Sequence, residues 1–317
     1  MLHGWIILDK PIGLGSTTAV SAVKRILREA GEPKTRVGHG GTLDPLASGV
    51  LPIALGEATK LAGRMLDATK AYDFTITFGA ETDTLDAEGV VTATSEARPT
   101  LEEIAAVLPR FTGEIEQAPP AYSALKVGGK RAYALARAGG EVVLKSRCIT
   151  IHSLTPQPNP SHSGEGLGGS KPLPFRGEVG MGNIDEITLS AHVSKGTYIR
   201  SLAHDIARAL GTVGHVTMLR RTRAGPFGLH QAISLDFLME KAKGRALEDV
   251  ILPLTAGLDD IPALSVSPAE AAMLRKGRVL TGISEHQGLH LASDGSTPVA
   301  LVEIADGNVR VVRGFNL

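Results

Sequence analysis

The chain of 317 residues has one cysteine, no hydrophobic run long enough to span a membrane and no excess of either charge. The single cysteine, Cys148, excludes an internal disulfide and supplies neither a CxxC pair nor a zinc knuckle. Because no stretch of about 18 apolar residues occurs, we expect no transmembrane helix. The first ten residues lack the basic and then apolar pattern of a secretory signal, and the ten histidines form no HExxH motif. These absences predict a cytoplasmic protein without a metal.

The charges balance in total but are segregated along the chain. Lys and Arg number 33, as do Asp and Glu, and a net charge of zero taken alone argues weakly against a nucleic-acid partner. Seven carboxylates lie in 81–103 against one arginine, whereas 126–147 and 195–223 each hold six basic residues against one carboxylate. Clusters of this kind attract a polyanion, although two solvated faces would have the same pattern.

The N-terminal segment predicts a strand, a turn and a helix. Residues 5–8 form a short apolar run typical of a buried strand, and Ser16 or Thr17 can cap the following helix, which Gly31 would end. The glycine-containing turn at 13–17 lacks both the Gly-Lys-Ser/Thr ending of a phosphate-binding loop and the third glycine of a dinucleotide fingerprint. Both nucleotide-binding interpretations are therefore rejected.

Periodicity farther along the chain predicts the fold class. Apolar and polar residues alternate over 72–78 and 187–193, as in half-buried strands. Helical spacing follows at 199–210, and the acidic turn at 86–89 is typical of a hairpin. Strands joined partly by hairpins and partly by helices indicate an α+β fold with a mixed or antiparallel sheet flanked by helices.

An insertion interrupts this pattern between 155 and 183, where five prolines and seven glycines fill 12 of 29 positions. Such a composition buries too little apolar area to offset the entropy of ordering it. We therefore predict a flexible insertion between two strands, to which no function is assigned.

A domain boundary is predicted near residues 252–262. Beyond it, residues 267–270 read Ser-Pro-Ala-Glu, a capping box with proline at the first helical position, and Asp306-Gly307 predicts a hairpin. We expect a first domain over 1–252 and a small β-rich second domain over 253–317.

Residues 36–51 contain four glycines and a proline within 16 positions. Such a backbone turns tightly or approaches a ligand closely. Asp44 is the only carboxylate in this segment, and Pro45 restricts it to extended conformations. An aspartate in a rigid loop is a candidate nucleophile or base, but an Asx turn would use the same residue structurally. The segment alone leaves both interpretations open.

Residues 38–51 resemble the catalytic-aspartate motif of the TruB-type tRNA pseudouridine synthases. Five further segments match the family in the same order: LDKP at 8–11, KAY at 70–72, PAYSALK at 120–126, GTYIR at 196–200 and HVTMLRR at 215–221. The resemblance extends from about residue 4 to residue 228, and the C-terminal module resembles a PUA-type RNA-binding domain. A 14-residue match followed by five ordered segments is specific, and it favours the catalytic interpretation of Asp44.

The resemblance implies an isomerase that converts uridine-55 to pseudouridine in the TΨC arm of tRNA without a cofactor, with Asp44 as the essential carboxylate. Tyr72 is expected to stack on a base flipped out of the RNA loop. Arg200 is expected to pair with the catalytic aspartate, which would keep that carboxyl ionised. The remaining implied substrate contacts are His39 in the space left by the flipped base, and Tyr198 and Leu219 lining the uracil pocket.

Contacts with the RNA backbone are implied as well. A basic segment over about 123–147 is expected to fold over the RNA arm, and a second basic cluster is expected to face phosphates. The expected contacts are Lys126, Lys130, Arg131, Arg220, Arg221 and Arg223. They predict an affinity that weakens with salt. We expect a monomer with no membrane and no obligate protein partner.

Three other interpretations fit the sequence less well. A dyskerin-like synthase acting with guide RNA would carry arginine and glycine extensions, which the sequence lacks. A non-catalytic RNA-binding or RNA-folding protein could use the same scaffold, but Asp44, Tyr72 and Arg200 are all present. A glycosidase would need two facing carboxylates, and no second candidate lies near the Asp44 loop.

Overall fold

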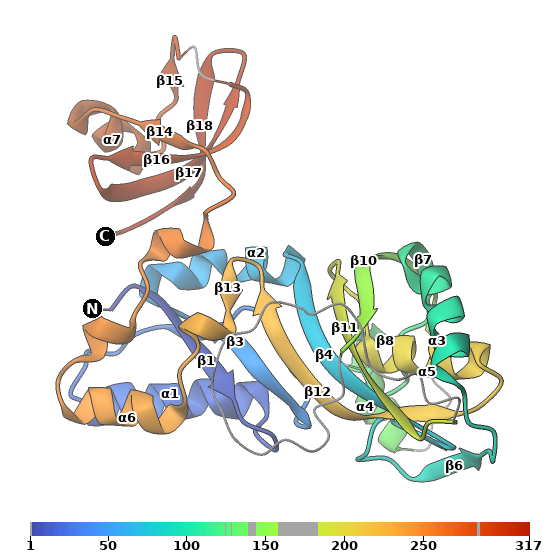
Figure 1. Ribbon diagram of the computed structural model, residues 1–317. Helices are drawn as coiled ribbons and strands as arrows, with labels where there is room; N and C mark the ends of the chain where they lie inside the picture. The colour runs from blue at the N-terminus through green and yellow to red at the C-terminus, as the bar shows by residue number, and fades with distance from the viewer. Residues whose placement is uncertain (1, 124, 128, 139–143, 158–182, 284–285) are drawn as a thin grey trace. The chain divides into compact units, whose positions relative to one another are not determined.

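The computed structural model describes residues 2–317 except 124, 128, 139–143, 158–182 and 284–285 (Figure 1). The described chain divides into two compact units. Unit 1 comprises Met1–Pro45, Gly49–Leu66 and Arg223–Leu317, and unit 2 comprises Leu46–Ser48 and Asp67–Thr222. Among the described helices, none is long and apolar enough to cross a membrane.

The N-terminal part of unit 1 is built on strand β3. Its elements are β1 (Gly4–Lys10), α1 (Ser16–Glu29), β2 (Val37–His39), β3 (Ala47–Leu55), the 3-10 helix η1 (Gly56–Leu61) and α2 (Ala62–Asp67). β1 and β2 both pair antiparallel with β3, in a register that sets Lys10 opposite Gly49 and His39 opposite Ile53. Gly31 follows the end of α1 with φ of 80°, a left-handed conformation that favours glycine. The strand at 5–8 and the helix end at Gly31 are therefore confirmed.

Aromatic packing joins distant parts of the sequence within unit 1. The rings of Trp5 and Phe227 lie 5.3 Å apart, and Trp5 Nε1 donates a hydrogen bond of 3.1 Å to the carbonyl of Leu254. Gly257 packs against the same indole, because a Cβ there would lie 2.9 Å from a ring carbon. The elements from Phe227 to Gly257 are β13 (Phe227–Gly228), η3 (Leu229–Gln231), α6 (Leu235–Lys243), η4 (Leu247–Val250) and η5 (Leu254–Gly257).

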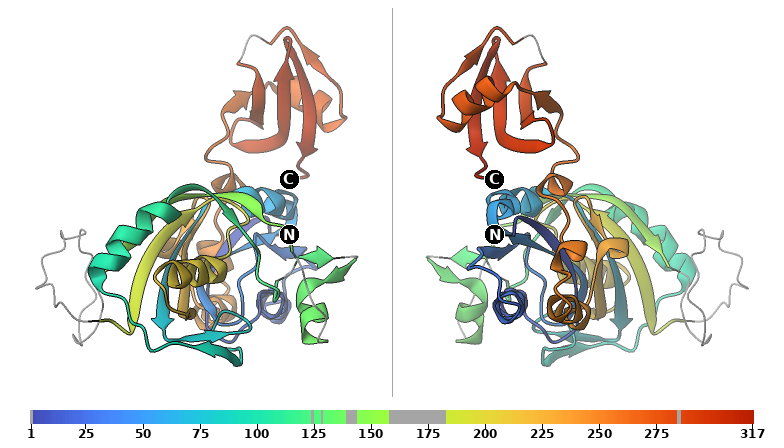
Figure 2. Two further views of the ribbon diagram at one scale, coloured as in Figure 1. Left: turned by 90° about the vertical axis from the view of Figure 1, so that its right-hand side faces the viewer. Right: turned by 90° about the vertical axis from the view of Figure 1, so that its left-hand side faces the viewer.

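The C-terminal residues of unit 1 form a curled β-rich module (Figures 1 and 2). Five strands lie in the order β14-β16-β17-β18-β15, with α7 packed against β16, β17 and β18. The predicted capping box is confirmed, because Ser267 and Glu270 each accept a hydrogen bond from the other's backbone N–H. The predicted hairpin turn at Asp306-Gly307 joins β17 to β18. The bounds are β14 (Ala263–Ser265), α7 (Pro268–Arg275), β15 (Leu280–Thr281), β16 (Gly288–Asp294), β17 (Thr297–Ala305) and β18 (Asn308–Gly314).

Unit 2 is a sheet in the order β12-β4-β11-β10-β7. β11 runs antiparallel to β4 and to β10, and β10 runs antiparallel to β7. The sheet strands are β4 (Lys70–Phe78), β7 (Gly113–Gln117), β10 (Arg147–Pro156), β11 (Glu186–Val193) and β12 (Gly214–Ala224). The other elements are β5 (Ala80–Thr82), β6 (Val91–Thr94), α3 (Leu101–Val107), η2 (Leu108–Phe111), β8 (Lys126–Val127), β9 (Lys130–Arg131), α4 (Ala132–Arg137) and α5 (Ile199–Ala209).

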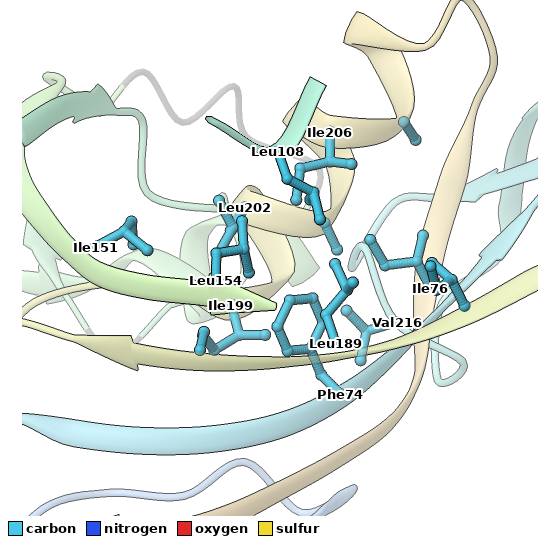
Figure 3. Close-up of a cluster of buried hydrophobic side chains, with 14 of the residues drawn as sticks. Phe74, Ile76, Leu108, Ile151, Leu154, Leu189, Ile199, Leu202, Ile206 and Val216 are labelled. Atoms are coloured by element: carbon cyan, nitrogen blue, oxygen red, sulfur yellow. The ribbon is translucent and has the colours of Figure 1, made fainter. Parts of the chain in front are cut away.

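The core of unit 2 follows the periodicities of its sequence. Phe74 and Ile76 from β4 and Leu189 from β11 pack against Leu202 and Ile206 of α5, and all five are completely buried (Figure 3). The predicted strands over 72–78 and 187–193 and the helix that follows are confirmed. Together with the curled C-terminal sheet, they confirm the α+β class.

A histidine–carboxylate cluster fixes α5 to β5, and it predicts a pH-dependent stability. His204 lies 3.0 Å from Asp205 and 3.2 Å from Glu81, which also binds Arg208 at 2.7 Å. The hydrogen bond to Asp205 and the charge of Glu81 raise the pKa of His204 despite its partial burial. A raised pKa stabilises the fold fully below the ordinary value of 6.5, and this contribution is lost as pH rises through the raised pKa.

We therefore expect His204→Gln to lower the free energy of unfolding at pH 5.5 by up to about 1 kcal/mol and to have less effect at pH 8.5. Urea unfolding of both proteins at the two pH values measures this difference. A loss of unfolding free energy that is larger at pH 8.5 than at pH 5.5 would contradict the raised pKa of His204. His286→Gln is a control at a position outside the cluster.

Candidate active site

The loop that carries Asp44 is anchored through its following residue, Pro45. Lys10 is completely buried at the end of β1, and its Nζ donates to the carbonyls of Pro11 (2.9 Å), Leu14 (2.7 Å) and Pro45 (3.2 Å). An ammonium group has three protons to donate, so each of these three carbonyls can accept one of them. The buried lysine therefore holds the turn after β1 against the loop.

The preceding residue, Leu43, is anchored by Ser16. The helix cap predicted at Ser16 or Thr17 is wrong: Gly15 occupies the N-cap position and no side chain caps α1. Ser16 Oγ instead donates to the Leu43 carbonyl at 2.9 Å and accepts from the Leu43 N–H at 2.8 Å. The hydroxyl is used by a loop 27 residues away, so both neighbours of Asp44 in the sequence are held by distant side chains.

Close backbone packing fixes the loop at Gly40. Its N–H donates to the carbonyl of Pro52 at 2.8 Å, and a Cβ at this position would lie 2.6 Å from Cβ of Met65. No larger residue fits without moving α2. The adjacent His39 ends β2, and both His39 and Asp44 are half-buried.

Arg200 is buried in the first turn of α5 and forms an ion pair with Asp86. Its guanidinium donates to the carbonyls of Thr84 (2.7 Å) and Tyr122 (2.9 Å) and lies 3.3 Å from Asp86 Oδ2. Asp86 also accepts from Thr84 Oγ1 at 2.6 Å and from the Glu88 N–H at 3.1 Å. Sequence reasoning missed Asp86, because its place in an acidic turn signals a hairpin and nothing local signals an arginine 114 residues away.

Tyr198 lies at the N-cap position of α5 and is held by Gln117, which sequence reasoning also missed. The Gln117 side chain is 1% exposed; its Oε1 accepts from the Tyr198 N–H at 2.8 Å and its Nε2 donates to the Tyr198 carbonyl at 3.0 Å. The Arg147 guanidinium lies over the phenol ring, 4.8 Å from its centroid, a favourable cation–π geometry. The end of β7 thereby fixes the residue that begins α5.

The two hydrogen bonds between Gln117 and the backbone of Tyr198, which we call the Gln117 clamp, predict a stability effect at a position with no catalytic role. Gln117→Leu leaves the partly buried N–H of Tyr198 without its acceptor, so we expect the free energy of unfolding to fall by about 1–3 kcal/mol. Gln157→Leu changes an exposed glutamine of the same unit and is expected to stay within about 0.5 kcal/mol. Urea unfolding compares the two variants, and equal effects would contradict the clamp.

The other predicted pocket residues lie on the sheet of unit 2. Tyr72 in β4 and Leu219 in β12 are partly buried and pack against the unit's hydrophobic core. Two residues before Tyr72, Lys70 is buried; desolvation first, then the nearby charge of Arg221, lowers its pKa to about 8. The burial of Lys70 thus makes its positive charge costly at this position of β4.

The predicted phosphate contacts differ in exposure. Arg221 is 1% exposed, a position suited to supporting the sheet, whereas Arg223 is exposed and Arg220 donates to Ser48 Oγ at 3.3 Å. The backbones of Lys126, Lys130 and Arg131 lie in the paired strands β8 and β9, but their side chains lie outside the described part of the structure. Residues 158–182, most of the predicted 155–183 insertion, also lie outside it.

Each unit thus brings part of the predicted site together. His39 and Asp44 lie on one anchored loop of unit 1, and Tyr198 and Arg200 lie at the start of α5 in unit 2, the unit that also holds Tyr72 and Leu219. The joining of these sets into one catalytic site, and the expected pairing of Arg200 with Asp44, stay predictions.

Comparison with known proteins shows the family. Residues 24–199 match the TruB family pseudouridylate synthase N-terminal domain, and residues 200–259 match the tRNA pseudouridylate synthase B C-terminal domain. A protein of Novosphingobium aromaticivorans named tRNA pseudouridine synthase B is 60% identical over 317 residues, covering 100% of this chain and 98% of the relative. One of the same name from Zymomonas mobilis is 58% identical, covering 99% and 96%.

Solved structures show the same fold. A Cbf5–Nop10–Gar1 complex contains a chain with a TM-score of 0.67 and 26% identity, covering 99% of this chain and 84% of the other. An H/ACA RNP bound to a substrate RNA contains one with a TM-score of 0.69 and 24% identity, covering 99% and 86%. The chain belongs to the TruB family of pseudouridylate synthases. The resemblance seen in its motifs is therefore confirmed, and the protein is an isomerase that forms pseudouridine.

Proposed function

We propose that this pseudouridine synthase acts on tRNA and converts uridine-55 of the TΨC loop, with Asp44 as the catalytic carboxylate. Support for tRNA as the substrate comes from two relatives named tRNA pseudouridine synthase B that are 60% and 58% identical over 317 and 315 residues. Support for Asp44 comes from its motif and from the anchored loop around it. The protein works as a cytoplasmic monomer that needs no cofactor.

The single observation that carries the assignment to Asp44 is the anchoring of both its neighbours. Ser16 binds the backbone of Leu43, and Lys10 binds the carbonyl of Pro45. A side chain whose backbone is held on both sides loses little further freedom when it engages a substrate, which is how a rigid scaffold lowers the entropic part of a reaction barrier. An Asx turn alone would not require two long-range anchors.

The chemistry rearranges a single nucleotide. The N1–C1′ glycosidic bond breaks, the uracil turns, and a C5–C1′ bond forms; the proton lost from C5 is balanced by the proton gained at N1. Uridine-55 lies inside a folded RNA loop and has to be flipped out, which costs a few kcal/mol. Stacking on the ring of Tyr72 returns about 1–3 kcal/mol, and His39 occupies the space that the base leaves.

The remaining pocket residues bind and position the uracil. Tyr198 and Leu219 line the pocket, and Tyr198 is held there by Gln117. Arg200 supplies the positive charge that keeps Asp44 ionised, and its own geometry is set by Asp86. Arg223, Arg220 and the basic segment 123–147 bind phosphates, while the C-terminal module over 253–317 acts as a PUA-like RNA-binding domain.

Tritium release from tRNA transcripts labelled with [5-³H]uridine tests the proposal, because C5 loses its proton when the C5–C1′ bond forms. The wild-type protein is expected to release one equivalent of tritium per tRNA. A transcript with cytidine at position 55 is expected to release none. Equal release from both transcripts would contradict the assignment to position 55, and no release from either would contradict tRNA as the substrate.

A further inference from the structure

A groove in unit 1 is lined with positive charge that the proposed catalytic residues do not use. It has a volume of about 920 Å³ and lies between α1, residues 32–38 and Thr59 of η1. Four of its lining residues are basic and one is acidic: Lys24, Arg28, Lys34, Arg36 and Glu32. We call it the α1 groove. Its formal charge is four positive minus one negative, or plus three.

The helix places two of these cations on one wall. Lys24 and Arg28 are four residues apart in α1 and so share a helix face. Lys34 and Arg36 lie in the segment that leads into β2 and line the groove with them. All four side chains are exposed, so the groove presents its charge to solvent.

In the part of the chain that the structure describes, none of these four cations forms an ion pair with a carboxylate, and Glu32 is the one acidic residue in the lining. Arg25, the remaining cation of α1, lies outside the groove and is 4.0 Å from Glu29 in an i,i+4 pair. Like charges at i,i+4, such as Lys24 and Arg28, destabilise a helix by a few tenths of a kcal/mol. A groove that concentrates unpaired cations at this cost is suited to a polyanion, whose phosphates would release their counterions on binding.

We propose that the α1 groove binds the sugar–phosphate backbone of the substrate RNA as the strand runs on from His39. This inference rests on the proposed function, in which His39 occupies the RNA loop. Gly38, the residue before His39, lines the end of the groove, so the groove and the predicted base-flipping loop are continuous along β2. The contacts are to phosphates and position the RNA without reading its bases.

Charge reversal on the helix wall tests the proposal. Lys24→Glu/Arg28→Glu is compared with Arg25→Glu/Lys243→Glu, which changes the net charge equally at exposed helical positions outside the groove. Binding of an unmodified tRNA transcript is measured from about 50 to 200 mM salt. The groove variant is expected to raise Kd at least about 10-fold and to reduce the slope of log K against log salt by about 0.7–0.9 per lost phosphate contact, or about 1.5 in total. The control is expected to stay within about twofold of wild type.

The outcomes separate this proposal from the function on which it rests. Equal Kd values and salt slopes for the two variants would overturn the groove assignment. The groove would then either bind no ligand or bind an acidic protein instead of RNA. Absence of tritium release by the wild type would instead overturn the proposed function. Thermal unfolding checks that both variants fold. If the helix pair does not fold, Lys34→Glu/Arg36→Glu on the other wall gives the same test.

Discussion

Asp44→Asn is expected to lower kcat for pseudouridine formation by at least about 10³-fold, which is about 4 kcal/mol of activation free energy at 1.36 kcal/mol per tenfold. Asparagine keeps the size of the side chain, and the anchors of the loop bind the backbone of Leu43 and Pro45 rather than the carboxyl. These backbone anchors remain in the variant while the negative charge is lost. Tritium release under multiple-turnover conditions with saturating tRNA measures the effect.

Binding separates a catalytic loss from a structural one. The Kd of the Asp44→Asn protein for tRNA is expected to stay within about threefold of wild type. Asp260→Asn, which changes an aspartate whose side chain is 66% exposed, is the matched control and is expected to keep wild-type kcat. Equal tritium release by the two variants would remove Asp44 as the catalyst, and a large rise in Kd would assign it a role in the loop instead.

Local periodicity explains why the strands and helices could be predicted. Alternation over 72–78 and 187–193 and helical spacing over 199–210 report which side of an element is buried, and this depends only on neighbours in the sequence. The capping box at 267–270 and the turn at Asp306-Gly307 are local in the same sense. Each of these predictions is confirmed by the structure.

Long-range hydrogen bonds explain what sequence reasoning missed. Ser16 has the residue type and position of a helix cap, but its hydroxyl binds a backbone 27 residues away. Gln117 binds a residue 81 positions distant, and Asp86 pairs with Arg200 across 114 positions. No spacing rule reports a partner at such separations. The motifs predict Asp44, Tyr198 and Arg200 as site residues, but the residues that hold these positions emerge only once the chain is folded.

The buried pair of Asp86 and Arg200 predicts the second large effect, on stability. Arg200→Met leaves Asp86 as a buried carboxylate without its cation, and breaking such a pair costs about 3–5 kcal/mol. Arg208→Met on the same helix removes an arginine whose side chain is 51% exposed, where an ion pair contributes less than about 1 kcal/mol. Urea unfolding of both variants measures the difference, and similar losses would contradict a stabilising pair at Arg200.

A double-mutant cycle tests whether Asp86 is the reason. Asp86→Asn removes the charge while keeping an acceptor for Thr84 Oγ1 and the Glu88 N–H. If the ion pair dominates, Asp86→Asn/Arg200→Met loses less stability than the sum of the single variants, because no charge is left buried alone. Activity gives a second test: Arg200→Lys is expected not to recover the activity that is lost when the guanidinium is removed. One ammonium group on a flexible stem does not reproduce the planar guanidinium that binds two carbonyls and a carboxylate. Additive losses in the cycle would mean that Arg200 does not act through Asp86. Full activity with lysine would mean that a positive charge at this position is enough.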